Sequence, residues 1–122
     1  MTDLIEVQTS TLAGAALDWT VAQVEGIEVA IAEPHYGTDW RVYRPESGGK
    51  YSPSTDWAVG GPLIDKHVRQ LKFYAGEYAE TAWRGETCDG WGEGPTPLVA
   101  ACRSILAAEV GDTVQVPKEL IP

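Results

Sequence analysis

Residues 51–62 hold the chain's densest group of side chains capable of chemistry; they read Tyr-Ser-Pro-Ser-Thr-Asp-Trp-Ala-Val-Gly-Gly-Pro. The prolines and glycines of this segment interrupt regular backbone hydrogen bonding, so we expect most of residues 51–62 to be a loop. Hydroxyl groups donate to anions, aromatic rings stack on a base or sugar, and a carboxylate accepts from a ribose hydroxyl or a base N–H. The segment is therefore a candidate binding site for a small anionic or nucleotide-like ligand.

Neighbouring segments would complete this candidate site. We expect Pro62 at the first position of a helix, whose free N–H groups would face an anion, while glycine lets a ligand approach the backbone closely. Residues 35–44 and 91–96 would close the pocket and add an arginine to hold the anion. The predicted ligand-binding residues are Tyr51, Ser52, Ser54, Thr55, Asp56, Trp57, Gly60, Gly61, Arg41 and Thr96.

A purely structural interpretation covers the same residues. Asp56 would cap a turn, Ser54 would bond to the local backbone, and Trp57 would fill the core. The residues alone leave both interpretations open.

Charge narrows the classes of partner. The 122-residue chain has a net charge of −9, made up of −6 over residues 1–33, +1 over 34–84 and −4 over 85–122. An acidic surface repels a phosphate backbone, so we expect no broad nucleic-acid binding, although a local anion site in the middle third stays possible. The polar start and short apolar stretches predict no membrane association and a cytoplasmic protein.

Catalytic and metal-binding patterns are weak. The two histidines, His35 and His67, belong to no metal-binding motif, and we expect no metal and no cofactor. A catalytic triad would need Ser52 or Ser54 beside His35 and Asp56, which is a matter of geometry and not of sequence. A small hydrolase is therefore our third choice. Cys88 and Cys102 are expected to be reduced and structural.

Hydrophobic spacing and capping residues predict three helices, at about residues 11–25, 62–68 and 97–110. Gly26 would end the first helix, which is apolar nearly all round and so should be central. Thr96 would cap the third helix, with Pro97 in its first turn.

Alternating residues predict two antiparallel hairpins. The expected strands are Ile27–Ala32 with Trp40–Tyr43, and Leu71–Tyr74 with Tyr78–Trp83. Residues 44–61 and 85–94 would be loops, and Asp112–Pro117 either a short edge strand or a tail. The result is a single α+β domain over residues 1–122, with the order helix-strand-strand-helix-strand-strand-helix and a small antiparallel sheet of two hairpins packed with three helices.

Three segments also resemble a known family. They are Ala16-Leu17-Asp18-Trp19-Thr20-Val21-Ala22, the loop from Tyr51 to Pro62, and Gly94-Pro95-Thr96-Pro97-Leu98-Val99-Ala100-Ala101-Cys102-Arg103 followed by Gly111-Asp112-Thr113-Val114-Gln115-Val116-Pro117. Together they are similar to the NinX-like proteins of tailed phages. The resemblance implies a phage or prophage accessory protein made inside a bacterial host, and it supplies no catalytic residues.

Two non-catalytic functions follow. The first is binding of the small anionic or nucleotide-like ligand. The alternative is a protein-interaction module that engages a host or phage protein through exposed tryptophans and the acidic N-terminal third. An exposed apolar surface on the first helix would also allow a homodimer.

Overall fold

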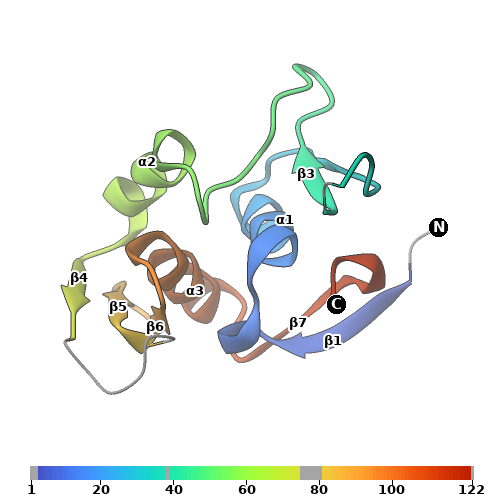
Figure 1. Ribbon diagram of the computed structural model, residues 1–122. Coiled ribbons are helices and arrows are strands. Elements are labelled where there is room, and N and C mark those ends of the chain that lie inside the picture. The colour runs from blue at the N-terminus through green and yellow to red at the C-terminus, as the bar shows by residue number, and fades with distance from the viewer. Residues whose placement is uncertain (1–2, 38, 75–80, 122) are drawn as a thin grey trace.

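Helices and short antiparallel strands alternate along the chain, as expected for the α+β class (Figure 1). A computed structural model describes residues 3–37, 39–74 and 81–121. Within them the helices are α1 (Gly14–Glu25), α2 (Trp57–His67) and α3 (Pro97–Glu109), with the 3-10 turns η1 (Thr9–Thr11) and η3 (Lys118–Leu120). The strands are β1 (Leu4–Gln8), β2 (Ala30–Ala32), β3 (Arg41–Tyr43), β4 (Gln70–Phe73), β5 (Trp83–Glu86), β6 (Trp91–Gly94) and β7 (Thr113–Pro117).

The strands form three separate antiparallel sheets where we had expected one. They are the pairs β1-β7 and β2-β3 and the three-stranded sheet β4-β5-β6. The β2-β3 hairpin is confirmed, with Ile31 opposite Val42. The alternative of an edge strand at the C-terminal end is also confirmed, but its partner, the N-terminal strand β1, was not foreseen (Figure 1).

Helix α1 is central, as its apolar surface predicted. Leu17 and Val21 are fully buried in a main core with α3, whereas Ala22 packs in a second cluster with Val42 and Tyr51. Gly26 ends the helix in the left-handed conformation, with φ of 70°. The expected start near residue 11 is wrong, because residues 9–11 form the turn η1.

Helix α2 begins five residues before the expected position. Asp56 is its N-cap and accepts a hydrogen bond from the Ala58 N–H at 2.9 Å, so Trp57 is the first helical residue and Pro62 lies inside the helix. The predicted start at Pro62 is therefore wrong. The Asp56 carboxylate accepts a hydrogen bond from an N–H of the first turn and so stabilises a helix that begins at Trp57. This stabilisation outweighs the helix-breaking tendency of Gly60-Gly61-Pro62.

Glycines of the three-stranded sheet lie directly against α3. A Cβ added to Gly92 would lie 2.6 Å from the Ser104 nitrogen, and one on Gly85 would lie 3.0 Å from the Ala100 oxygen. Only glycine permits this approach, and small residues on α3 provide the facing surface. The prediction of a loop over residues 85–94 is consequently wrong, since its glycines belong largely to β5 and β6.

The second hairpin also differs from the prediction. β4 pairs with Trp83–Glu86, with Phe73 opposite Trp83. Half of the predicted partner strand, Tyr78–Trp83, falls in residues 75–80, outside the described residues, and of its other half only Trp83 lies in a strand. No helix among the described residues is long and apolar enough to span a membrane.

Candidate functional site

The loop before α2 is anchored on α1 by a buried carboxylate. Asp18 Oδ1 accepts a hydrogen bond from the Ser54 N–H at 2.9 Å, and only 5% of Asp18 is exposed. The bond joins residues 36 positions apart. It fixes the end of the loop, just before α2, to the central helix α1.

Burial dominates the electrostatics of this carboxylate. Loss of hydration raises the pKa of Asp18 to about 6, although the nearby Ser54 hydroxyl, the Ser54 N–H that donates to it and the Lys50 charge lower it in part. No cation lies within ion-pair distance of Asp18 among the described residues. At neutral pH the site therefore holds a mostly ionised acid that is only partly compensated.

Two buried hydroxyls of the loop lack a well-formed hydrogen bond within the described residues. They are Tyr51 Oη and Ser54 Oγ; the latter lies near the Asp18 carboxyl without the geometry of a good hydrogen bond. Burial, followed by the charge of Glu25, raises the pKa of Tyr51 to about 12, so its hydroxyl stays protonated. Unpaired buried polar groups cost free energy, and a binding site is one place where that cost is tolerated.

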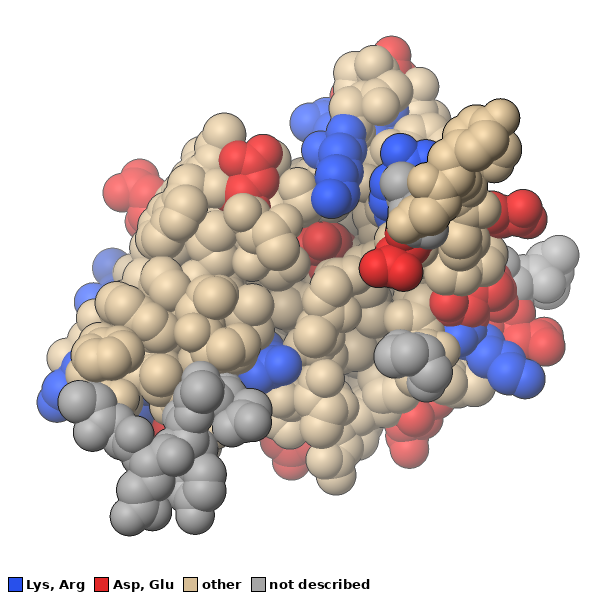
Figure 2. Space-filling model, in the orientation of Figure 1, with Lys and Arg blue, Asp and Glu red and all other residues tan. Residues whose placement is uncertain are grey.

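A groove beside this anchor, the Arg41 groove, has a volume of about 320 Å³. It is lined by Gly14, Ala15, Asp18, Asp39, Trp40, Arg41, Val42, Lys50 and Thr55. Basic and acidic side chains lie close together over β3 and the loop that follows it (Figure 2). The groove thus offers two cations, an indole ring and two carboxylates to one ligand.

A second hollow of about 240 Å³ lies on the other side of Thr55, and we call it the Thr96 hollow. Ser54, Thr55, Trp57 and Thr96 line it, together with the first residues of α3. The Thr96 hydroxyl is already used as a cap, accepting from the Val99 N–H at 3.2 Å. Trp57 is 56% exposed, so its ring is open to solvent and does not fill the core.

The structure thus divides the predicted site residues into separate groups. Thr55 and Arg41 meet in the Arg41 groove, and Ser54, Thr55, Trp57 and Thr96 meet in the Thr96 hollow. The remaining residues serve the loop and helix: Tyr51 and Ser52 are buried, Asp56 caps α2, and Gly60 and Gly61 lie inside it.

Gly60 and Gly61 do not form the predicted anion site at a helix N-terminus. The Gly60 N–H donates to the Asp56 carbonyl at 2.8 Å and is not free for a ligand. A Cβ on Gly60 would lie 2.3 Å from the Pro53 oxygen, so glycine is needed for packing at this position. Asp18 and Lys50 were missed, and Asp39 and Trp40 were included only as part of the range 35–44. An acid within a helix that is apolar nearly all round is a usable signal for Asp18.

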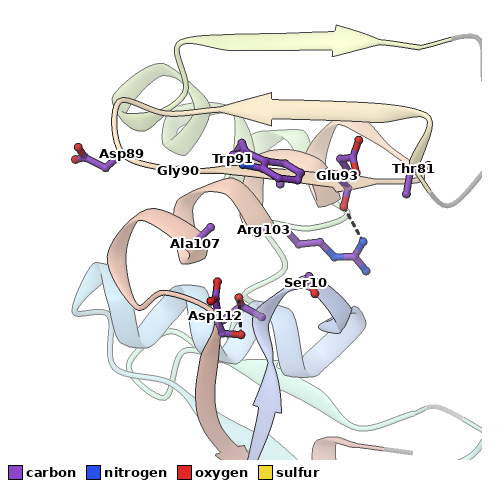
Figure 3. Close-up of a pocket in the computed structure, with 11 residues that line it drawn as sticks. Ser10, Thr81, Asp89, Gly90, Trp91, Glu93, Arg103, Ala107 and Asp112 are labelled. Carbon is purple, nitrogen blue, oxygen red and sulfur yellow. Dashed lines mark hydrogen bonds between the residues drawn. The ribbon is translucent and has the colours of Figure 1, made fainter.

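A larger hollow, about 680 Å³ in volume, lies at β6. The side chains of Trp91 and Glu93 come from β6, Arg103 and Ala107 from α3, and Ser10 and Asp112 from the opposite wall (Figure 3). Arg103 crosses the hollow and donates to the carbonyls of Leu12 and Glu93, at 2.9 Å and 2.8 Å. Because residues 85–94 were predicted to be a loop, this hollow was missed.

The described residues were compared with the requirements of a metal site and of a reactive thiol. They contain no group of three His, Cys, Asp or Glu side chains that would hold a metal ion. Both cysteines are free, with Cys88 exposed and Cys102 buried in α3. Burial raises the pKa of the Cys102 thiol to about 12, which leaves it protonated and unreactive near neutral pH.

Comparison with known proteins completes this description. No curated protein matches the chain. The family described as bacteriophage P22 NinX matches residues 8–109, a range that includes α1, the Asp18–Ser54 anchor and all of α3. The match covers most of the chain, and the protein therefore belongs to the NinX family of phage proteins.

Proposed function

We propose that this NinX-family protein binds a small anionic, nucleotide-like ligand in the Arg41 groove. The observation that carries the proposal is the presence of Arg41 and Lys50 in one groove with the buried carboxylate of Asp18. Nucleotides combine an anionic phosphate with N–H and hydroxyl donors, and such a ligand would use both kinds of group.

The two cations are available for an anion. Neither Arg41 nor Lys50 forms an ion pair with a described residue, and both are exposed. By contrast, Arg44 on the same segment is paired with Glu46 at 2.6 Å. A guanidinium group binds phosphate through two parallel hydrogen bonds, whereas lysine acts as a point charge.

The rest of the groove suits the remainder of such a ligand. The half-buried Trp40 offers an indole ring against which a base or sugar would pack. Asp18 and Asp39 would accept hydrogen bonds from base N–H groups or ribose hydroxyls. Thr55 adds a hydroxyl on the side that faces the Thr96 hollow.

Thermal unfolding with a panel of nucleoside mono-, di- and triphosphates, cyclic nucleotides, free nucleosides and inorganic phosphate tests the proposal. We expect at least one nucleotide to raise the melting temperature, with calorimetry giving its affinity. Arg41→Gln should weaken binding about tenfold or more, since a hydrogen bond to a charged group contributes roughly 1.5–3 kcal/mol.

Arg44→Gln is the matched control, because it removes the same charge from the same segment outside the groove. Its affinity should stay close to that of the unchanged protein. The proposal fails if no compound of the panel raises the melting temperature, or if both variants lose affinity equally.

A further inference from the structure

We propose that the free edge of β6 binds an extended, basic peptide segment of a partner protein by strand addition. This site is separate from the Arg41 groove and does not depend on the ligand proposed there. The occupied space would be the hollow between β6 and the opposite wall, which is formed by η1 and by Asp112, the residue before β7 (Figure 3).

The first step is that β6 presents unpaired backbone groups. It is the outer strand of the β4-β5-β6 sheet. Thr87 N–H donates to the Gly90 carbonyl at 2.8 Å, and Gly92 lies opposite Gly85 in the same register. Antiparallel ladders alternate, so Gly92 bonds to β5 while the N–H and C=O groups of Trp91 and Glu93 face away from it.

An independent contact confirms this direction. The Glu93 carbonyl accepts from Arg103 Nη1 at 2.8 Å, on the side opposite β5. One outward acceptor is therefore occupied, whereas the Trp91 N–H, the Trp91 carbonyl and the Glu93 N–H have no outward hydrogen bond to any described residue and would pair with the added strand. Sheet edges of this kind template the pairing of another strand.

The second step is that the edge is rigid and has space beside it, except next to the Glu93 carbonyl, where the Arg103 guanidinium lies. The close approach of Gly92 to Ser104 holds β6 on α3. The opposite wall is also fixed, because the Thr9 N–H donates to the Asp112 carbonyl at 2.9 Å. A strand added here would enter a preformed site and would pay little of the ordering cost that a mobile edge imposes.

Trp91 provides a platform for side chains of the added strand. It is 52% exposed, yet the Arg84 guanidinium lies over its ring with 4.1 Å between the guanidinium carbon and the ring centre. The cation holds the indole in place and leaves its remaining surface open. Aromatic groups of this kind are enriched where proteins meet.

The third step is charge, which selects the partner. Asp89, Glu93 and Asp112 are acidic residues that border the hollow, and the carboxylates of Asp89 and Glu93 project from the β6 side, away from the opposite wall (Figure 3). Among the described residues Arg103 is the one cation of the lining, and it already donates to two carbonyls. The protein as a whole carries −9. A peptide with Lys or Arg is complementary to this lining, while a second copy of the chain would bring like charges together.

A synthetic peptide of alternating Lys and Val residues is the probe. It is compared with a Glu-Val peptide of the same length and with a Lys-Val peptide whose backbone is N-methylated at alternate residues. In an NMR titration we expect the Lys-Val peptide to shift and protect the amides of Trp91 and Glu93. The other two peptides should bind about tenfold more weakly or worse.

Two variants of one residue separate backbone pairing from charge. Glu93→Pro and Glu93→Thr both remove the carboxylate, but only proline removes the outward N–H, which an edge strand tolerates. Glu93→Pro should lose about tenfold more affinity than Glu93→Thr. Arg41→Gln should leave peptide binding unchanged, so this proposal and the nucleotide proposal can fail separately.

Several results would overturn strand addition. They are equal binding of the N-methylated peptide, amide shifts that map elsewhere, no binding at about 1 mM peptide, or equal affinities of the two folded Glu93 variants. A dimer in sedimentation experiments that pairs β6 with β6 would instead assign the edge to a second copy. If Glu93→Pro does not fold, the N-methylated peptide decides the question alone.

Discussion

Asp18 is the residue on which the candidate site depends most. It is a buried acid near the middle of α1, it holds the loop through the Ser54 N–H, and it also lines the Arg41 groove. One side chain therefore both holds the loop in place and lines the groove proposed to bind the ligand. Asp56, which occurs in a similar Asp-Trp pair, has a local role as the cap of α2. The two aspartates that precede a tryptophan thus have different roles, because Asp18 is buried against a distant loop and Asp56 lies at the start of its own helix.

Asp18→Asn should stabilise the protein at neutral pH. The folded protein raises the pKa of Asp18 from 3.8 to about 6, so folding binds a proton more tightly and stability falls as pH rises between these values. A shift of this size corresponds to about 3 kcal/mol. The amide removes the charge and keeps an acceptor for Ser54. Denaturant unfolding at pH 4 and pH 7 should show a gain at pH 7 that is much smaller at pH 4.

The lowered pKa of Glu25 supplies an internal control. Burial opposes this shift, but hydrogen bonds from Lys66 and His67 outweigh it, so this acid stabilises the fold above its unfolded pKa and loses that contribution as pH falls. Both proteins contain Glu25, and its effect cancels in the difference. Equal destabilisation of Asp18→Asn at both pH values would contradict the assigned role.

At the scale of elements, close backbone packing explains where the glycines lie. Gly85, Gly92 and Gly94 belong to strands that touch α3, and Gly60 belongs to a helix that touches the loop before it. In each case a methyl group would meet another segment. Glycine in these positions indicates contact between elements, whereas Gly26 at the end of α1 indicates a local change of backbone direction.

Gly60→Ala should destabilise the protein, and Gly61→Ala should not do so to the same extent. A Cβ on Gly60 would meet the Pro53 oxygen at 2.3 Å, but one on Gly61 meets nothing within 4 Å. Overpacking costs about 1–3 kcal/mol, and the first contact is with backbone, which yields little. For Gly61 the helical gain of alanine is offset by strain before Pro62, for a net change below about 1 kcal/mol.

Denaturant unfolding of the two variants measures this difference directly. The two changes are chemically identical and occupy neighbouring positions of α2, so they differ in what the new methyl group meets and in the strain before Pro62, which affects only Gly61→Ala. Equal stability of the two variants would show that the loop shifts to admit the methyl group.

At the scale of the whole molecule, the main core joins distant parts of the sequence. Residues of α1, α2, α3, β7 and η3 pack in one cluster, and β1 pairs with β7 so that the ends of the described chain lie together (Figure 1). Arg103 adds a polar connection from α3 to Leu12, the residue after η1, and to β6. The core therefore forms only when segments that are far apart in the sequence come together.

Thermal unfolding should therefore be one cooperative transition. Calorimetric and van't Hoff enthalpies should agree, as they do for single domains of this size. Removal of residues 113–121 should abolish the transition, because it takes away β7 and two members of the core, Val116 and Leu120. Two separate transitions would instead indicate that the second cluster, around Tyr51, folds independently.

The sequence by itself determined the features that depend on local physics. Gly26 and Thr96-Pro97 mark helix ends because capping acts within one turn, and the β2-β3 hairpin follows from alternation in two neighbouring segments. The charge distribution and the family motifs are likewise properties of the chain.

Only the tertiary structure decided the features that join distant segments. The Asp18 carboxylate in α1 holds a loop residue 36 positions away. The glycines of residues 85–94, which predicted a loop, lie largely in strands packed against α3. The segments near the two ends pair as β1 and β7. The grooves follow from these contacts. Each contact depends on which surfaces meet after folding, and local spacing carries no information about a partner that lies far along the chain.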